Sequence, residues 1–122
     1  MTVFLSTKPR VRRNVRVGRR LEHYAVVERS IGDLIPTFLN NRQREVESLR
    51  HALVMGDFEL VRRLGHRMRG VGGSYGFEYV SLLGQRLEQC SRERDADLLG
   101  ELVSEYADYL STVRIEYSEP VR

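Results

Sequence analysis

A chain of 122 residues is long enough for one hydrophobic core but not for two. Its hydrophobic and charged contents, 41% and 30%, are typical of a globular domain, and the single cysteine, Cys90, excludes an internal disulfide. No apolar run approaches the roughly 18 residues of a membrane-spanning helix. Residues 1–6 carry no charged leader ahead of a long apolar segment, so we expect a cytoplasmic protein without a signal peptide.

The charge is unevenly distributed along the chain. Residues 1–20 hold seven Lys or Arg side chains and no acid, a net charge of +7, whereas the remaining residues carry a net charge of −4. We interpret residues 1–20 as a mostly disordered basic tail, and residues 118–122 as a short C-terminal tail. The basic tail either anchors the chain to nucleic acid or an acidic partner, or only aids solubility.

The two ends of the central region leave alternatives open. Residues 15–17 and 113–117 both alternate apolar and polar positions, so the two ends could pair as a small sheet. Residues 21–31 suit either a short helix or an extended stretch. Ser30 and Asp33 resemble a capping box, and Asp33 can itself cap the helix that follows.

Apolar residues at helical spacing predict four amphipathic helices further along the chain. The predicted helices cover residues 34–55, 58–75 and 80–92, and a last one from a cap at Asp95 to residue 113. Their short connections favour an all-α fold, an antiparallel up-down four-helix bundle over residues 21–117 with a short extra N-terminal element.

Residues 64–77 stand out because they contain five of the ten glycines of the chain, beside His66 and two arginines. Each glycine within a helix costs about 1 kcal/mol relative to alanine. We infer from the glycines at 65, 70, 72 and 73 that something must come close to this surface.

A helical wheel at about 100° per residue separates a core face from a polar face in this stretch. The core stripe consists of Leu60, Val61, Leu64, Met68 and Val71. His66 lies on the opposite side, and its neighbours there are Arg62, Arg69, Gly70 and Gly73. Because the glycines carry no side chain, the wheel predicts an exposed imidazole flanked by cations, which is a place for an incoming anion.

The segment His66-Arg67-Met68-Arg69-Gly70, with Gly76 ten residues after the histidine, resembles the histidine-containing phosphotransfer (Hpt) domain family. The motif of that family reads His-x-x-Lys-Gly, followed by a second glycine at the same distance. Three further segments also resemble family members, and the resemblance covers about residues 30–115. These segments are Pro36 to Arg42, the Gly56-Asp57-Phe58 turn and Tyr75-Gly76-Phe77.

The resemblance implies that His66 is the phospho-accepting residue, with Arg69 and Gly70 next to the phosphate and Gly76 at the close-packed end of the helix. Arg69 stands where the family has lysine, and arginine presents a planar fork instead of a mobile point charge. The chemistry agrees with this role, because neutral imidazole is nucleophilic and histidine forms covalent intermediates.

The chain itself contains no carboxylate cluster for Mg²⁺ and no phosphate-binding loop in its motif stretch. The resemblance implies that a response-regulator receiver domain supplies the aspartate and the Mg²⁺, with a sensor histidine kinase as a second candidate partner. We therefore expect a monomeric phosphoryl carrier that has no cofactor of its own and is not an autonomous enzyme. Nucleic acid and membranes are not expected partners.

Two other functions remain as alternatives. The bundle could dock receivers or kinases without carrying phosphate, or the basic tail could bind nucleic acid, with an affinity that falls steeply with salt.

Several other residues have simpler interpretations. His23 and His51 are interpreted as surface side chains, and no two histidines have the spacing of a helical zinc site. Aromatic residues 75, 77 and 79 form either part of a docking surface or, as we favour, core at a helix junction. Gly84 either allows close packing against another helix or leaves a small exposed gap on the helix surface.

Overall fold

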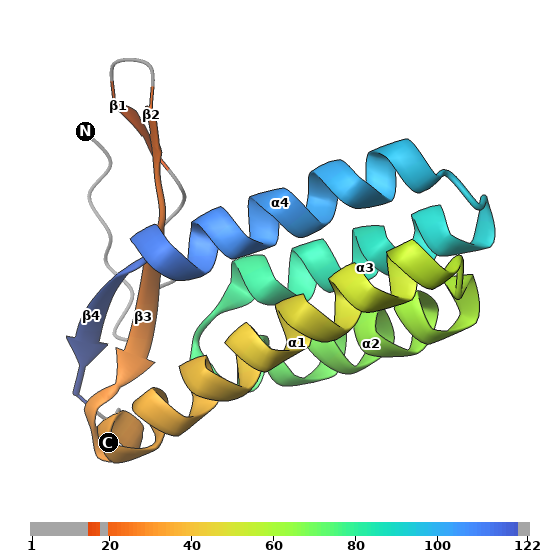
Figure 1. Ribbon diagram of the computed structural model, residues 1–122. Coiled ribbons are helices and arrows are strands. Elements are labelled where there is room, and N and C mark those ends of the chain that lie inside the picture. Colours follow the sequence, from red (N-terminus) through yellow and green to blue (C-terminus); the bar gives the residue numbers. More distant parts are fainter. Residues whose placement is uncertain (1–14, 18–19, 120–122) are drawn as a thin grey trace.

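The computed structural model describes residues 15–17 and 20–119, and four α-helices make up most of this part of the chain (Figure 1). The helices are α1 (Ile35–Met55), α2 (Phe58–Val71), α3 (Glu78–Arg92) and α4 (Ala96–Thr112). The predicted all-α bundle is therefore confirmed. The main difference is that the second helix ends at Val71, and a short 3-10 helix, Gly73–Tyr75, follows it.

Local signals explain most helix ends. Asp57 and Asp95 cap α2 and α4, because their carboxylates accept the backbone N–H groups of Leu60 and Leu98. Gly56 ends α1 with a φ of 68°, the left-handed conformation that glycine adopts without strain. The predicted cap of α1 was wrong, since the helix begins after Leu34 without a side-chain cap.

A 3-10 helix, Arg29–Leu34, occupies the place where the capping box was predicted. Its Ser30 hydroxyl donates to the Glu28 carboxylate at 2.9 Å, so it does not cap α1. Pro36 stands in the first turn of α1, where its missing N–H costs nothing.

Short strands lie at one end of the bundle. Strand β3 (Tyr24–Glu28) pairs in parallel with β4 (Arg114–Ser118), in a register that places Ala25 opposite Ile115. Residues 24–28 are thus extended, and the helical alternative was wrong there. Ala25 and Val27 are fully buried, so alternate residues of β3 face the core.

The predicted pairing of the two chain ends was wrong in its partner. Strand β1 (Val15–Val17) pairs antiparallel with β2 (Arg20–Glu22), while β4 pairs with β3. The strand predicted at residues 113–117 is present as β4, but its partner is β3 and not residues 15–17. Within the tails predicted at residues 1–20 and 118–122, Val15–Val17 form β1, Arg20 begins β2 and Ser118 ends β4, so these positions are ordered strand. The expected disorder of residues 1–14 and 18–19, and the tail residues 120–122, lie outside the described residues.

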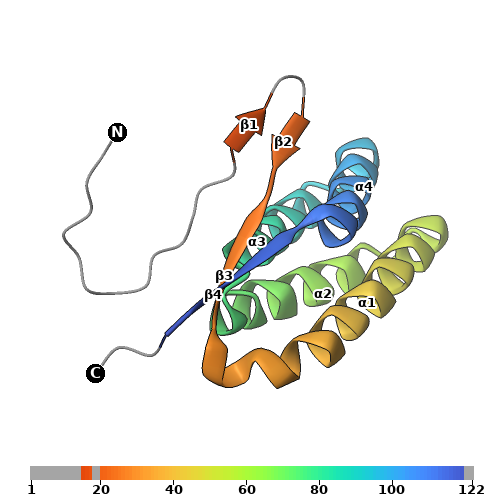
Figure 2. The same cartoon turned by 90° about the vertical axis from the view of Figure 1, so that its left-hand side faces the viewer.

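The helices α2 and α3 approach each other most closely, at Gly65 and Gly84. A Cβ atom on Gly65 would lie 2.8 Å from the carbonyl oxygen of Gly84, and one on Gly84 would lie 2.5 Å from that of Gly65. Close packing at Gly84 is therefore confirmed. Both α2 and α4 contact α1 and α3, so α2 and α4 are diagonal to each other in the bundle (Figure 2).

Aromatic rings fill the junction between the strands and the helices. Phe77 is fully buried and stacks on Phe38, which also stacks on Tyr75, as expected for core residues. The surface position predicted for His23 was wrong. Its side chain is only 8% exposed because it lies between the rings of Tyr79 and Tyr109, where the chain enters β3 beside α4. His51 is exposed, as predicted.

Candidate functional site

Helix α2 positions His66 by burying its opposite face. Val61 and Met68 are fully buried and Leu64 is 5% exposed, so this stripe fixes the rotation of the helix in the bundle. The His66 side chain is 67% exposed on the far side of the helix, as the wheel predicts. The ring is therefore open to solvent and to another protein.

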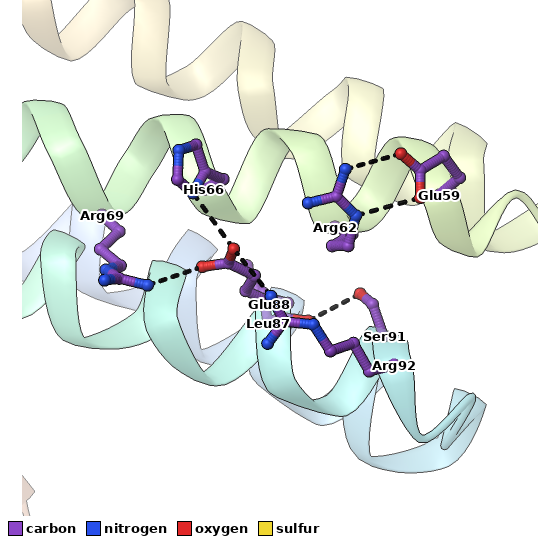
Figure 3. Close-up of polar contacts among 8 residues, drawn as sticks. All are labelled: Glu59, Arg62, His66, Arg69, Leu87, Glu88, Ser91 and Arg92. Atoms are coloured by element: carbon purple, nitrogen blue, oxygen red, sulfur yellow. Dashed lines mark hydrogen bonds and ion pairs between the residues drawn. The ribbon is translucent and has the colours of Figure 1, made fainter.

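The side chain of Glu88, on α3, contacts the ring of His66 (Figure 3). Its Oε2 lies 3.1 Å from Nδ1 of His66, and its Oε1 accepts a hydrogen bond from Nη1 of Arg69 at 3.1 Å. Arg92 adds a third contact, 3.3 Å from its Nη2 to Oε2. The Glu88 side chain is only 5% exposed, so one buried carboxylate ties together two residues of α2 and one of α3.

The surroundings of Glu88 favour its charged form. Burial acts to raise the pKa of the Glu88 carboxyl, but the hydrogen bonds from His66 and Arg69 and their positive charge outweigh that effect. The pKa of Glu88 is consequently lowered from its ordinary value.

An ionised carboxylate accepts hydrogen bonds and cannot donate them. In the neutral ring of His66, the proton must therefore be on Nδ1, which faces Glu88. The other ring nitrogen, Nε2, then carries the free electron pair. The contact with Glu88 thus selects the tautomer in which Nε2 is the nucleophile.

The two predicted cations have different partners. Arg69 reaches the carboxylate that also holds His66, so the structure brings these two site residues together. Arg62 instead forms a double contact with Glu59 one turn earlier, at 3.0 Å from Nε and 2.7 Å from Nη2 (Figure 3). The positive charge of Arg62 is therefore already matched within α2.

The glycines of the motif stretch also divide into two groups. Nothing lies within 4 Å of the place that a Cβ atom on Gly70 would occupy, so this turn of α2 is open beside His66. Gly65 and Gly72 face inward, where a Cβ atom would clash with backbone atoms of α3 and of the residue before it. At these two positions the glycines make room for α3 of the same chain. The inference that a partner molecule comes close there was therefore wrong.

Gly73 and Gly76 lie beyond the end of α2. The N–H group of Gly73 donates to Oγ of Ser81, and a Cβ atom there would come within 3.2 Å of the Glu78 carboxylate. Gly73 is therefore not part of the open turn, because α2 ends before it. Gly76 has a φ of 91° and packs against the carbonyl group of Val26, at the close-packed end of the stretch.

Sequence reasoning missed Glu88, the buried partner of the site. A signal was present, because Glu88 follows Gly84 by four residues and so lies within about 40° of it on the same face of α3. An acid on the face that a glycine opens toward a neighbouring helix is a candidate partner for a residue on that helix.

Within the described residues, no three His, Cys, Asp or Glu side chains are arranged to hold a metal ion. In the same part of the chain, no helix combines the length and the apolar character that spanning a bilayer requires.

Comparison with known proteins places the chain in a family. The model of the Hpt domain matches residues 33–116, which is more than half of the chain. No curated protein and no solved structure gives a significant match. Hpt domains are phosphocarrier modules and not enzymes, and they interact with receiver domains and kinases. The chain therefore belongs to the Hpt domain family and has a role related to phosphotransfer in two-component signalling.

Proposed function

We propose that Nε2 of His66 accepts a phosphoryl group from the phosphorylated aspartate of a receiver domain and then relays it to a second receiver. The observation that carries this proposal is the exposed ring of His66, whose Nδ1 is hydrogen-bonded to the buried carboxylate of Glu88. This arrangement provides both access and a single nucleophilic nitrogen.

The transfer step needs no additional proton donor or acceptor. The electron pair of Nε2 attacks phosphorus, and the N–P bond forms while the bond between phosphorus and the aspartate oxygen breaks. The electron pair of the broken bond leaves with the aspartate carboxylate. The imidazole keeps its Nδ1 proton and gains positive charge, which the Glu88 carboxylate stabilises at a distance of 3.1 Å.

Arg69 and Gly70 complete the site on the same helix. The side chain of Arg69 is 55% exposed, and its charge lies three residues from His66, where it attracts the incoming phosphoryl oxygens. Gly70 leaves the next turn free of side-chain atoms, so a partner can approach along the line of attack.

The receiver supplies the aspartate and the Mg²⁺, so this chain acts as a carrier without a cofactor of its own. The groups that this protein contributes, namely His66, Glu88, Arg69 and Gly70, all belong to one chain, so a monomer suffices. The kinase that feeds the relay is a second partner of the same face.

The test is transfer of radiolabelled phosphate from a phosphorylated receiver domain, chosen from those encoded near this gene. We expect acid-labile label on the wild type, none on His66→Gln, and full label on His51→Gln, a control for an exposed histidine. Equal label on the wild type and His66→Gln would overturn the proposal. Binding of the receiver without any label would support the docking alternative instead.

A further inference from the structure

A polar pocket lies between α1 and α2. Helix α2 packs on both α1 and α3, which lie on either side of it (Figure 2), and the contact of His66 with Glu88 is on its α3 side. The pocket on the α1 side, here called the α1–α2 pocket, has a volume of about 320 Å³. Its polar lining residues are Asn41, Arg42, Arg44, Glu45 and Ser48 of α1 and Arg67 of α2. Positions 41, 45 and 48 are three or four residues apart, so they share one face of α1.

The α1–α2 pocket has an excess of positive charge, because three arginines and one acid line it. The acid, Glu45, is buried, and its Oε1 accepts the hydroxyl of Tyr106 at 2.7 Å and lies 3.1 Å from Nε of Arg42. Burial raises the pKa of the Glu45 carboxyl, although the hydrogen bond from Tyr106 and the charges of Arg42 and Arg67 act to lower it. Even a fully ionised Glu45 leaves a net charge of +2 on the pocket.

Arg42 is a pre-oriented cation in the wall of this pocket. The residue is only 9% exposed, and its guanidinium lies 4.9 Å from the centroid of the Phe38 ring. Its contact with Glu45 uses Nε alone, and no described residue accepts a hydrogen bond from Nη1 or Nη2. Nε is sealed from solvent, whereas the other two nitrogens are not among the sealed atoms that lack a hydrogen bond. Nη1 and Nη2 therefore have surface available to a ligand in the pocket.

Two further cations line the pocket from different helices. Arg44 and Arg67 are exposed, and no ion pair joins either of them to an acid in residues 23–119, whose side chains the structure describes. Other arginines of the same helices, Arg50 and Arg62, do pair with an acid one turn away. The pocket thus brings together three guanidinium groups whose charge the surrounding side chains leave largely unmatched.

This set of donors suits a phosphate group better than a carboxylate. A guanidinium fork binds either group, but a phosphate carries a charge of about −2 near neutral pH, and a carboxylate only −1. Its three terminal oxygens can accept hydrogen bonds from several arginines at once, and the amide of Asn41 and the hydroxyl of Ser48 add neutral donors. The volume of about 320 Å³ is within the range of pockets that bind small molecules.

We propose that the α1–α2 pocket binds the phosphate group of a small molecule, inorganic phosphate or a phosphate monoester, between Arg42 and Arg44 of α1 and Arg67 of α2. The phosphate is a ligand there and not a phosphoryl donor, so no bond forms or breaks. This inference does not depend on the proposed phosphotransfer, because no residue that lines the pocket takes part in the contact between His66 and Glu88.

The test is a titration of the full ¹⁵N-labelled chain with glycerol 3-phosphate and, separately, with inorganic phosphate, at constant ionic strength. We expect saturable shifts of the backbone amide signals of residues 41–48 and 64–67 with at least one of the two probes. Tighter binding of the ester identifies a phosphate monoester as the ligand, and equal binding identifies free phosphate. Acetate should bind at least about tenfold more weakly, because it has one charge and two oxygens. Acetate binding of equal affinity, or no saturable shift with either phosphate, overturns the proposal.

Paired variants identify the residues responsible. The double variant Arg44→Gln, Arg67→Gln changes only exposed side chains, and it should weaken phosphate binding at least about tenfold, because hydrogen bonds to charged groups are lost. The matched control Arg50→Gln, Arg86→Gln removes the same charge from exposed positions outside the pocket and should bind phosphate as the wild type does. Equal weakening in the two double variants would mean that the net charge of the chain attracts phosphate, which overturns the proposal.

The variant His66→Gln separates this pocket from the phosphotransfer site. We expect the phosphate-induced shifts of residues 41–48 to be the same in His66→Gln and in the wild type. Loss of these shifts in His66→Gln would assign the bound phosphate to His66 and overturn the proposal. A chain that binds phosphate in the pocket but takes no label on His66 contradicts only the proposed phosphotransfer, so the two failures are distinguishable.

Discussion

The two faces of α2 use the same residue type for opposite purposes. On the inner face, Gly65 has no room for a side chain, because the backbone of α3 at Gly84 fills that space. On the outer face, Gly70 has open space and leaves the turn beside His66 uncovered. A run of glycines in a helix therefore does not by itself indicate a site for an outside partner, since part of it can serve the packing of the chain on itself.

The inner face nevertheless determines the chemistry of the outer one. Glu88 follows Gly84 by one helical turn on α3, and it reaches His66 because the two backbones approach so closely at the glycines. A wider separation of α2 and α3 would leave the buried carboxylate without its partners. The contact between the glycines and the orientation of the imidazole are thus two parts of one arrangement.

The largest effect is expected for Gly84→Ala. The new Cβ atom would lie 2.5 Å from the carbonyl oxygen of Gly65 and 2.6 Å from the amide nitrogen of Arg69, and backbone atoms cannot move aside easily. Overpacking of this kind costs about 1–3 kcal/mol, and the gain in helix propensity offsets about 1 kcal/mol at most. We expect the free energy of unfolding, measured with urea, to fall by about 2 kcal/mol. An unchanged value would show that the close approach is not required.

Glu88→Gln separates the charge of the carboxylate from its shape. The amide oxygen can still accept the Nδ1 proton of His66, but the negative charge that stabilises the phosphorylated ring is lost. We expect the initial rate of phosphoryl transfer to fall about tenfold, which corresponds to about 1.4 kcal/mol in the barrier. Glu59→Gln is the control, because Glu59 contacts Arg62 and not His66. A similar fall of the transfer rate in both variants would contradict the proposal that the charge of Glu88 stabilises the phosphorylated ring.

The same variant predicts a dependence of stability on pH. The pKa of Glu88 is lowered from 4.5, so its ionised form stabilises the fold above that pH, and this contribution is lost as the pH falls through the lower value of the folded state. Glutamine does not titrate. The difference in unfolding free energy between the wild type and Glu88→Gln should therefore shrink as the pH is lowered below 4.5. Glu45, whose pKa burial raises, has the opposite dependence but is present in both proteins.

Parts of this arrangement follow from the sequence and others do not. The exposure of His66 was predictable because helical periodicity fixes which side chains share a face with the core residues. The role of Glu88 was only partly predictable: its spacing from Gly84 indicates the face of α3 on which it lies, but its contact with His66 depends on the distance between two helices. The burial of His23 between Tyr79 and Tyr109 and the parallel pairing of β3 with β4 likewise depend on contacts between residues far apart in the chain.

Gly70→Ala provides the counterpart to the change at Gly84. A Cβ atom at this position meets nothing within 4 Å, so the substitution adds helix propensity without a clash. We expect the free energy of unfolding to rise by up to about 1 kcal/mol in the same urea experiment. Gly65→Ala, on the inner face five residues earlier, should lower it. If both substitutions change stability in the same direction, the contrast between the two faces of α2 is wrong.

The smallest effect is expected for Arg62→Ala. Both predicted cations lie on the outer face, but the guanidinium of Arg62 is held by Glu59, whereas Arg69 contacts the carboxylate that holds His66. Exposed ion pairs between residues three apart contribute little, so loss of Arg62 should change the rate of phosphoryl transfer by less than about twofold. Arg69→Ala should reduce it several-fold in the same assay, because a charge next to the reacting ring is lost. Equal effects of the two substitutions would mean that the overall positive charge of this face, and not the contact at Glu88, determines the rate.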